Sequence, residues 1–79
     1  MPRYYFDILD ADGMRRDDVG KLCDDLDGAV AQAQTLLPDI VRAERPDGAW
    51  HDIGCDVRSD DGRIVYQGEL TYRGRRLPG

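Results

Sequence analysis

The sequence predicts an α+β domain of β-β-α-β-β order, in which an antiparallel sheet carries one helix packed on one face. Apolar and polar residues alternate near the N-terminus, apolar residues recur every three or four positions in the middle, and two further alternating segments flank an Asp-Gly pair. The 79 residues suffice for one domain. A core of this size contributes only about 3–5 kcal/mol, so we expect a partner to add stability.

The first strand is predicted over residues 3–9, which are aromatic and β-branched and place Tyr4, Phe6 and Ile8 on one face. The polar segment DADGMRRDD follows and is predicted as a loop. Residues 19–23 have the composition of a short second strand. These two segments form the first half of the predicted sheet.

The helix is predicted to begin after Asp25, a suitable N-cap, and to end before Pro46, with a turn at Asp47–Gly48. Its apolar face comprises Leu26, Ala29, Val30, Ala33, Leu36, Leu37, Ile40 and Val41. Pro38 removes a backbone donor and crowds the preceding turn. We therefore expect a kink over residues 34–38.

The last two strands are predicted on either side of Asp61–Gly62, a pair typical of two-residue hairpin turns. Such a turn sets three pairs on the inner face: Val57 with Tyr66, Cys55 with Gly68 and Ile53 with Leu70. A three-residue loop over residues 60–62 with a bulge is the alternative, and it would shift the register and turn Val65 inward. The predicted core of the whole domain is Phe6, Ile8, Val30, Leu37, Ile53, Val57 and Leu70.

The chain is predicted to form a single domain over residues 1–72, followed by a flexible basic tail over residues 73–79. The net charge is −5, yet residues 1–27 hold eight acidic and four basic side chains, whereas residues 57–79 hold five basic and three acidic ones. The acidic head and the basic tail attract each other, within one chain or between two copies, although each exposed pair contributes only about 0–1 kcal/mol.

The apolar segments and the cysteines indicate the cellular compartment of the protein. No stretch approaches the roughly 20 apolar residues of a membrane span. The N-terminus lacks the apolar segment of a secretory signal, and the two cysteines do not form a disulfide framework. We therefore expect a cytoplasmic protein that does not enter a membrane.

Several short motifs point to a family. The opening MPRYYFDI, the DADG segment, the acid-acid-Val-Gly step at residues 17–20, the acid-Leu start of the helix and the DDGRIV segment resemble a family of small uncharacterised bacterial proteins that open Met-Pro-Arg-Tyr-Phe/Tyr-Phe. The resemblance covers nearly the whole chain. It implies the same architecture, and it implies no activity, cofactor or site residue.

Metal sites fit the sequence poorly. In a calcium loop starting at Asp10, Arg15 falls where glycine is needed and Lys21 falls where the bidentate glutamate is needed. A zinc site built from Cys23, His51 and Cys55 would lack the close cysteine pair of such sites. We expect no metal and no cofactor.

The two cysteines have different predicted environments. Cys55 lies at an inward strand position and is predicted to be a core thiol. Cys23 precedes a helix N-terminus, which favours a reactive thiolate, but Asp24 and Asp25 oppose that charge. Whether Cys23 is reactive therefore stays open.

The hydroxyl residues do not form a catalytic motif. Ser59, Thr35 and Thr71 stand apart from one another in the sequence, and there is one histidine and no Gly-rich phosphate loop. We therefore expect a protein that is not an enzyme.

The remaining hypotheses concern binding. One helix covers only one face of the sheet, and the other face is expected to carry Tyr5, Leu9 and Val65, which favours a protein-interaction module that self-associates as a homodimer. In that homodimer Tyr5 and Leu9 lie at the interface. The alternative is weak nucleic-acid binding by the basic hairpin and tail. Its contacts would be Arg58, Arg63, Arg73, Arg75 and Arg76.

Overall fold

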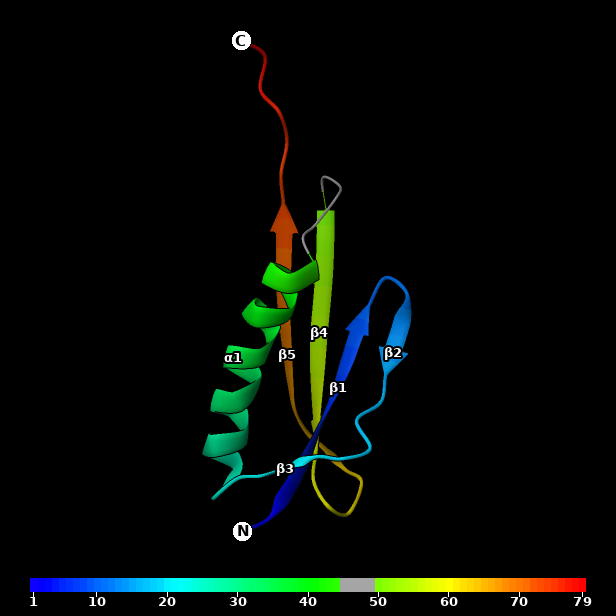
Figure 1. Cartoon of the computed structure of the whole chain (residues 1–79), viewed down its shortest axis with the longest axis vertical. Helices are drawn as coiled ribbons and strands as arrows, with labels where there is room; N and C mark the ends of the chain where they lie inside the picture. The colour runs from blue at the N-terminus through cyan, green and yellow to red at the C-terminus, as the bar shows by residue number, and fades with distance from the viewer. Residues whose placement is uncertain (45–49) are drawn as a thin grey trace.

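The computed structural model describes residues 1–44 and 50–79, apart from the side chains of residues 44, 50 and 51. Five strands and one helix follow one another in the order β1 (Arg3–Asp10), β2 (Gly13–Arg15), β3 (Lys21–Leu22), α1 (Leu26–Glu44), β4 (Trp50–Arg58) and β5 (Ile64–Arg73). The sheet is antiparallel, with the order β2-β1-β4-β5 and with β3 paired to β1 (Figure 1). The α+β class is confirmed. The predicted turn at Asp47–Gly48 lies outside the described residues.

The predicted β-β-α-β-β order lacks one short strand. β2 pairs with the end of β1 through a tight turn, in which Asp10 Oδ1 accepts a hydrogen bond from the N–H of Asp12 at 2.9 Å and Gly13 has φ 119°. All three residues of β2 are exposed. The segment was predicted as loop because a fully exposed strand has no apolar face to reveal it.

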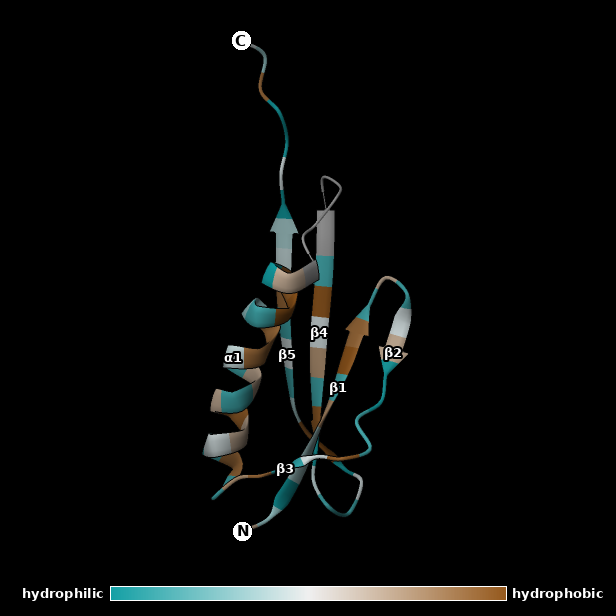
Figure 2. Cartoon of the chain, in the orientation of Figure 1, coloured by the Kyte–Doolittle hydropathy of each residue, from teal (hydrophilic) through white to brown (hydrophobic). Residues whose placement is uncertain are grey.

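The core lies between α1 and the inner face of the sheet (Figure 2), where the apolar side of the helix faces the strands. It comprises Tyr4, Phe6, Ile8, Cys23, Ala29, Ala33, Leu37, Ile53, Cys55 and Val57. Two predicted core residues differ: Leu70 is half-buried against this cluster and Val30 is half-buried outside it. Ala29 and Ala33 are fully buried between α1 and the sheet, whereas the larger side chains of Val30 and Leu70 stay partly exposed.

The N-terminus of α1 is capped as predicted. Asp25 Oδ1 accepts a hydrogen bond from the N–H of Gly28 at 2.9 Å, and the carbonyl of Asp25 accepts from Ala29 at 3.2 Å. The helix continues through Pro38 to Glu44. The kink expected near Pro38 stays a prediction.

The last hairpin combines features of both predicted alternatives. The three inner pairs, such as Val57 with Tyr66, are confirmed. The two-residue turn is wrong, because Ser59 pairs with Arg63 around a three-residue loop that ends in Gly62 at φ 86°. A bulge between Val57 and Arg58 then adds one residue to β5, which restores the register.

Candidate functional site

One edge of the sheet, along β1, is covered by the chain segment that runs from β2 to β3. Ile8 pairs with Arg15 and Tyr4 pairs with Lys21, so β1 advances four residues while the covering segment advances six. Two extra residues must therefore leave the ladder between β2 and β3. A gap of this kind exposes backbone groups of β1 unless a side chain replaces the missing strand.

Asp17 fills this gap. Its Oδ2 accepts a hydrogen bond from the N–H of Phe6 at 3.0 Å, which replaces a strand carbonyl. Its Oδ1 accepts from Val19 and Gly20, both at 3.0 Å, and holds the loop in place. Gly20 has φ 72°, and a Cβ at this position would lie 2.8 Å from the carbonyl oxygen of Tyr4, so glycine is required there.

A buried ion pair links this edge to β4. Arg58 donates from Nε to Asp7 Oδ2 at 2.6 Å and from Nη2 to Asp7 Oδ1 at 3.1 Å. Nη2 also donates to the carbonyl of Asp17 at 2.9 Å, and Asp7 accepts from the N–H of Asp17 at 2.9 Å. The Arg58 guanidinium lies over the ring of Tyr5, 4.9 Å from its centroid. Asp7, Asp17 and Arg58 therefore form one polar network, which we call the edge clamp.

The edge clamp shifts the pKa values of its carboxyls. The hydrogen bonds from Arg58 outweigh burial and lower the pKa of Asp7 below its ordinary value of 3.8. Burial alone would raise the pKa of Asp17. The hydrogen bonds from backbone N–H groups, led by that of Gly20, outweigh the effect of burial and lower this pKa. Both carboxyls are therefore ionised at neutral pH, and the edge clamp holds two negative charges and one positive charge.

The face of the sheet opposite α1 is more polar than predicted. Tyr5 and Leu9 lie on it half-buried, as part of the alternation of β1, but buried Asp7 and Asp56 lie between and beside them. Asp56 accepts a hydrogen bond from the Gln67 side chain at 3.0 Å. The prediction that this face is apolar was wrong. It rested on the aromatic and aliphatic residues and did not consider the carboxylates that alternate with them.

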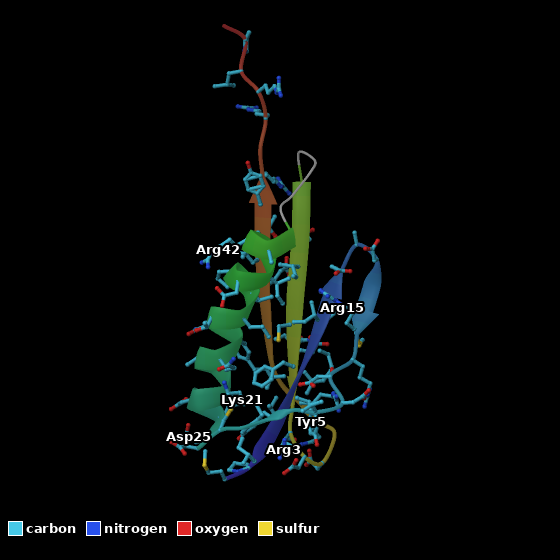
Figure 3. All side chains as sticks on the ribbon, viewed as in Figure 1. Arg3, Tyr5, Arg15, Lys21, Asp25 and Arg42 are labelled. Atoms are coloured by element: carbon cyan, nitrogen blue, oxygen red, sulfur yellow. The ribbon has the colours of Figure 1, made fainter. Side chains whose placement is uncertain are left out.

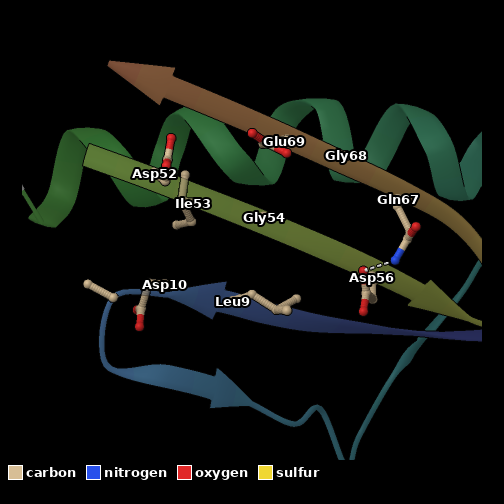
Figure 4. Close-up of a pocket in the computed structure, with 10 residues that line it drawn as sticks. Leu9, Asp10, Asp52, Ile53, Gly54, Asp56, Gln67, Gly68 and Glu69 are labelled. Carbon is tan, nitrogen blue, oxygen red and sulfur yellow. Dashed lines mark hydrogen bonds between the residues drawn. The ribbon is translucent and has the colours of Figure 1, made fainter. Parts of the chain in front are cut away.

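A shallow hollow of about 710 Å³ lies on this face and is lined in part by Gly54. Figure 4 shows the residues that line it. Leu9 and Gln67 line it together with carboxylates from three strands. These are Asp10, Asp52, Asp56 and Glu69. Among the described residues, no group of three or more His, Cys, Asp or Glu side chains is arranged to hold a metal ion. The segment over residues 10–18 forms the β1–β2 turn and β2, and it contributes Asp17 to the edge clamp.

Val65, the third predicted interface residue, is half-buried and packs against the core cluster. It is the residue that the bulge adds to β5. The structure therefore places it against the core, as the three-residue-loop alternative implied, and does not group it with Tyr5 and Leu9.

Both cysteines are buried and free. Burial, with a smaller contribution from the charge of Asp56, raises the pKa of the Cys55 thiol to about 11, so this thiol stays protonated at neutral pH. Cys23 Sγ lies 3.9 Å from the carbonyl of Lys21.

The predicted nucleic-acid contacts are not gathered into one basic surface. Arg58 is held in the edge clamp with 11% of its side chain exposed, and exposed Arg63 pairs with Asp61 at 3.4 Å. Arg73 ends β5, and Arg75 and Arg76 lie in the segment beyond it, which stands away from sheet and helix (Figures 1 and 3). Nucleic-acid binding therefore depends on the tail and stays a prediction.

The other edge of the sheet is the outer side of β5. Within residues 1–44 and 50–79, no strand pairs with that side. Hydrogen bonding alternates along antiparallel strands. The N–H of Phe6 points towards Asp17 and therefore away from β4. Its partner Val57 then directs its backbone N–H and C=O towards β5, and Tyr66, the partner of Val57 on β5, directs its own towards β4. The backbone groups of Gln67, Glu69 and Thr71 therefore point outward at the free side of β5.

An apolar groove of about 190 Å³ runs between β5 and α1, beside this free edge. Leu37 and Pro38 contribute from the helix, and Tyr66 and Leu70 contribute from the strand. Gly68 forms part of the groove floor, where a Cβ would lie 3.4 Å from Leu37 Cδ1 and 3.3 Å from Tyr66 Cε2. The open edge thus combines unpaired backbone groups with an apolar surface.

Sequence reasoning missed both the edge clamp and the open edge. Asp7 was a usable signal, because a carboxylate inside a strand rich in aromatic residues needs a cationic or hydrogen-bonding partner. The open edge was not readable, because strand order in the sheet does not follow from alternation.

Comparison with known proteins identifies the family. Residues 3–71 match the model of a domain of unknown function, DUF6894, and the chain belongs to this family. The resemblance to a small uncharacterised family is thereby confirmed. No curated protein and no solved structure matches the chain significantly. Within the described residues, no helix has both the length and the apolar character needed to cross a membrane.

Proposed function

We propose that this protein is a small, non-enzymatic interaction module that self-associates through the open edge of β5. The observation that carries the proposal is this edge: β5 has ten residues, and among the described residues it has a paired neighbour on one side only. A row of outward N–H and C=O groups is a template for another strand. Soluble proteins often protect such edges with proline or with charged side chains, especially lysine. β5 contains no proline or lysine, and its charged residues are Glu69 and the terminal Arg73.

The apolar groove supports the same surface. A strand added to β5 would lie beside Leu37, Tyr66 and Leu70 and would remove their exposed parts from water. Each buried Å² of apolar surface contributes about 25 cal/mol, which matters for a domain whose core is small. Tyr5 and Leu9, on the opposite face, lie next to buried charges, so the β5 edge is the better candidate for the interface.

The hydroxyl groups support a non-enzymatic function. Thr35 donates to the carbonyl of Ala31 within the helix, Ser59 donates to Asp61 within the turn, and Thr71 donates to Asp52 across the strands. These local bonds are typical of caps, turns and strand pairs. An activated nucleophile instead needs a base and donors for the developing charge.

Sedimentation equilibrium on the full chain tests the proposal. We expect a dimer at high micromolar concentration. Glu69→Pro should shift it towards monomer, because proline removes an outward N–H without removing a bond to β4. Glu69→Gln is the matched control, since it keeps the N–H and should keep the dimer.

The opposite face provides the contrasting variant. Leu9→Glu places a charge beside the hollow on the outer face and should leave the dimer intact. A dimer that is lost in Leu9→Glu and kept in Glu69→Pro would place the interface on the outer face instead. A wild-type chain that stays monomeric at high micromolar concentration would refute self-association altogether.

A further inference from the structure

We infer that two copies pair antiparallel along β5, with Gly68 of each copy at the two-fold axis and the basic tail of each copy beside the acidic turn of the other. This inference rests on the self-association proposed above and specifies its geometry. A two-fold axis perpendicular to the sheet makes the edge contact isologous and closed. It also keeps both helices on the same face, so the two grooves beside β5 meet over the contact.

The register follows from which residues share a face. Residues directly opposite each other in an antiparallel pair point to the same face, so the axis passes through a residue opposite its own copy. An axis at Glu69 would set two carboxylates directly opposite each other, which is destabilising. An axis at Gly68 sets Glu69 opposite Gln67 of the second copy, and Leu70 opposite Tyr66 of the second copy.

Gly68 also suits the axis sterically. By the alternation described above, its backbone groups point towards β4, so it would form the close, non-hydrogen-bonded type of pair, with Cα atoms about 4.5 Å apart. Its missing Cβ already allows Leu37 and Tyr66 to pack closely. Two glycines at the axis leave space where a pair of larger side chains would compete with both helices.

Charge complementarity selects the same register. Counting outward from Gly68, the seventh and eighth residues are Arg75 and Arg76 in one direction, and Asp61 and Asp60 in the other. The bulge at Val65 changes this match by one residue, so the tail arginines still lie beside the turn. The tail extends beyond the end of β5, away from the body of its own copy (Figure 1).

Both acidic side chains of the turn are accessible. Asp60 and Asp61 are exposed, and so are their contacts within the chain, to the N–H of Arg3 and to Arg63. Hydrogen bonds led by that from Ser59 lower the pKa of Asp61, which keeps it ionised at neutral pH. The tail arginines and these carboxylates can form ion pairs with hydrogen bonds. At an exposed surface, salt weakens such ion pairs.

Charge reversal tests the tail contact. We expect Arg75→Glu with Arg76→Glu to weaken the dimer about tenfold at low salt and much less at 0.5 M salt. Asp60→Lys alone should weaken it a few-fold, and combining it with the tail reversals should bring the dissociation constant back towards the wild-type value. Arg42→Glu, on α1, changes the net charge in the same direction and should have little effect.

The outcomes separate the two proposals. A monomeric wild type overturns self-association and this geometry together. A dimer that is weakened by Glu69→Pro but unchanged by the tail reversals overturns the tail contact and leaves the β5 interface standing. A dimer weakened equally by Arg42→Glu and by each tail reversal would show a general charge effect and would also overturn the tail contact.

Cysteine cross-linking tests the register. A mixture of Gln67→Cys and Glu69→Cys chains should form a disulfide between copies under mild oxidation, because these positions lie directly opposite each other. Glu69→Cys alone should not, and the native cysteines do not interfere because both are buried. Efficient self-cross-linking of Glu69→Cys would overturn the axis at Gly68.

Discussion

The two edges of the sheet are treated in opposite ways. Along β1, two short strands and the side chain of Asp17 bind the outward backbone groups, and Arg58 fixes the covering segment through Asp7. Along β5, ten residues have a free side and an apolar groove beside it. Both edges belong to the same small sheet. The size and composition of the domain therefore do not explain why the β1 edge is covered and the β5 edge is free.

This contrast is the reason that we propose the β5 edge, and not the β1 edge, as the surface of self-association. An edge can be closed at low cost by a short strand or a charged side chain. The chain commits three charged residues and a glycine to closing the β1 edge, and within the part of the chain that the structure describes no strand or charged network covers the outer side of β5.

Arg58→Met should destabilise the closed edge most. It leaves the buried carboxylate of Asp7 without its cation, which typically costs about 3–5 kcal/mol. For a domain of this size that loss is enough to unfold much of the population. Urea unfolding followed by circular dichroism measures it. Arg63→Met, which removes an exposed pair, is the control and should change the free energy of unfolding by less than about 1 kcal/mol.

Asp17→Ala should cost somewhat less, about 2–3 kcal/mol, because it leaves the N–H of Phe6 and the loop amides without their acceptor. The neighbouring Asp18→Ala is the matched control, since Asp18 is exposed. We expect Asp17→Ala also to open the β1 edge, which an increase in amide exchange at Phe6 and Tyr4 would reveal. Equal unfolding midpoints for the two variants would contradict the function assigned to Asp17.

Acid should destabilise the fold through the same two carboxyls. Their folded-state pKa values lie below the ordinary value of 3.8, so the unfolded chain binds protons first as the pH falls. The stabilisation is complete above about pH 5 and is lost as the pH falls through the folded-state values. Urea titrations between about pH 7 and pH 2 measure this slope. Asp7→Asn should flatten it, whereas a slope unchanged in that variant would contradict the assignment.

The sequence predicted those elements whose side chains alternate or recur with a clear period. Asp25 located the start of α1, and the apolar pairs across the last hairpin gave the correct register. The predicted two-residue length of the loop at Gly62 was wrong. A three-residue loop and a bulge compensate each other, so the strand pairs beyond them are the same as with a two-residue turn. Local turn chemistry alone cannot distinguish this case from a simple two-residue turn.

The candidate site was less predictable for a different reason. Arg58 was assigned to nucleic-acid contact because sequence shows charge and not burial, and its partners Asp7 and Asp17 lie 51 and 41 positions away. Tyr5 was correctly placed on the outer face, but the arginine that covers its ring was not foreseen. Which strand ends the sheet depends on tertiary packing, so the free side of β5 required the structure.

Amide hydrogen exchange at the two edges, measured over a range of protein concentrations, distinguishes an edge closed within the chain from an edge closed by a second copy. We expect the Phe6 amide to be protected at every concentration, because Asp17 of the same chain binds it. The Glu69 and Thr71 amides should exchange rapidly in dilute protein and become protected as the concentration rises. Rapid exchange at Glu69 and Thr71 at all concentrations would contradict the claim that the β5 edge is the surface of self-association.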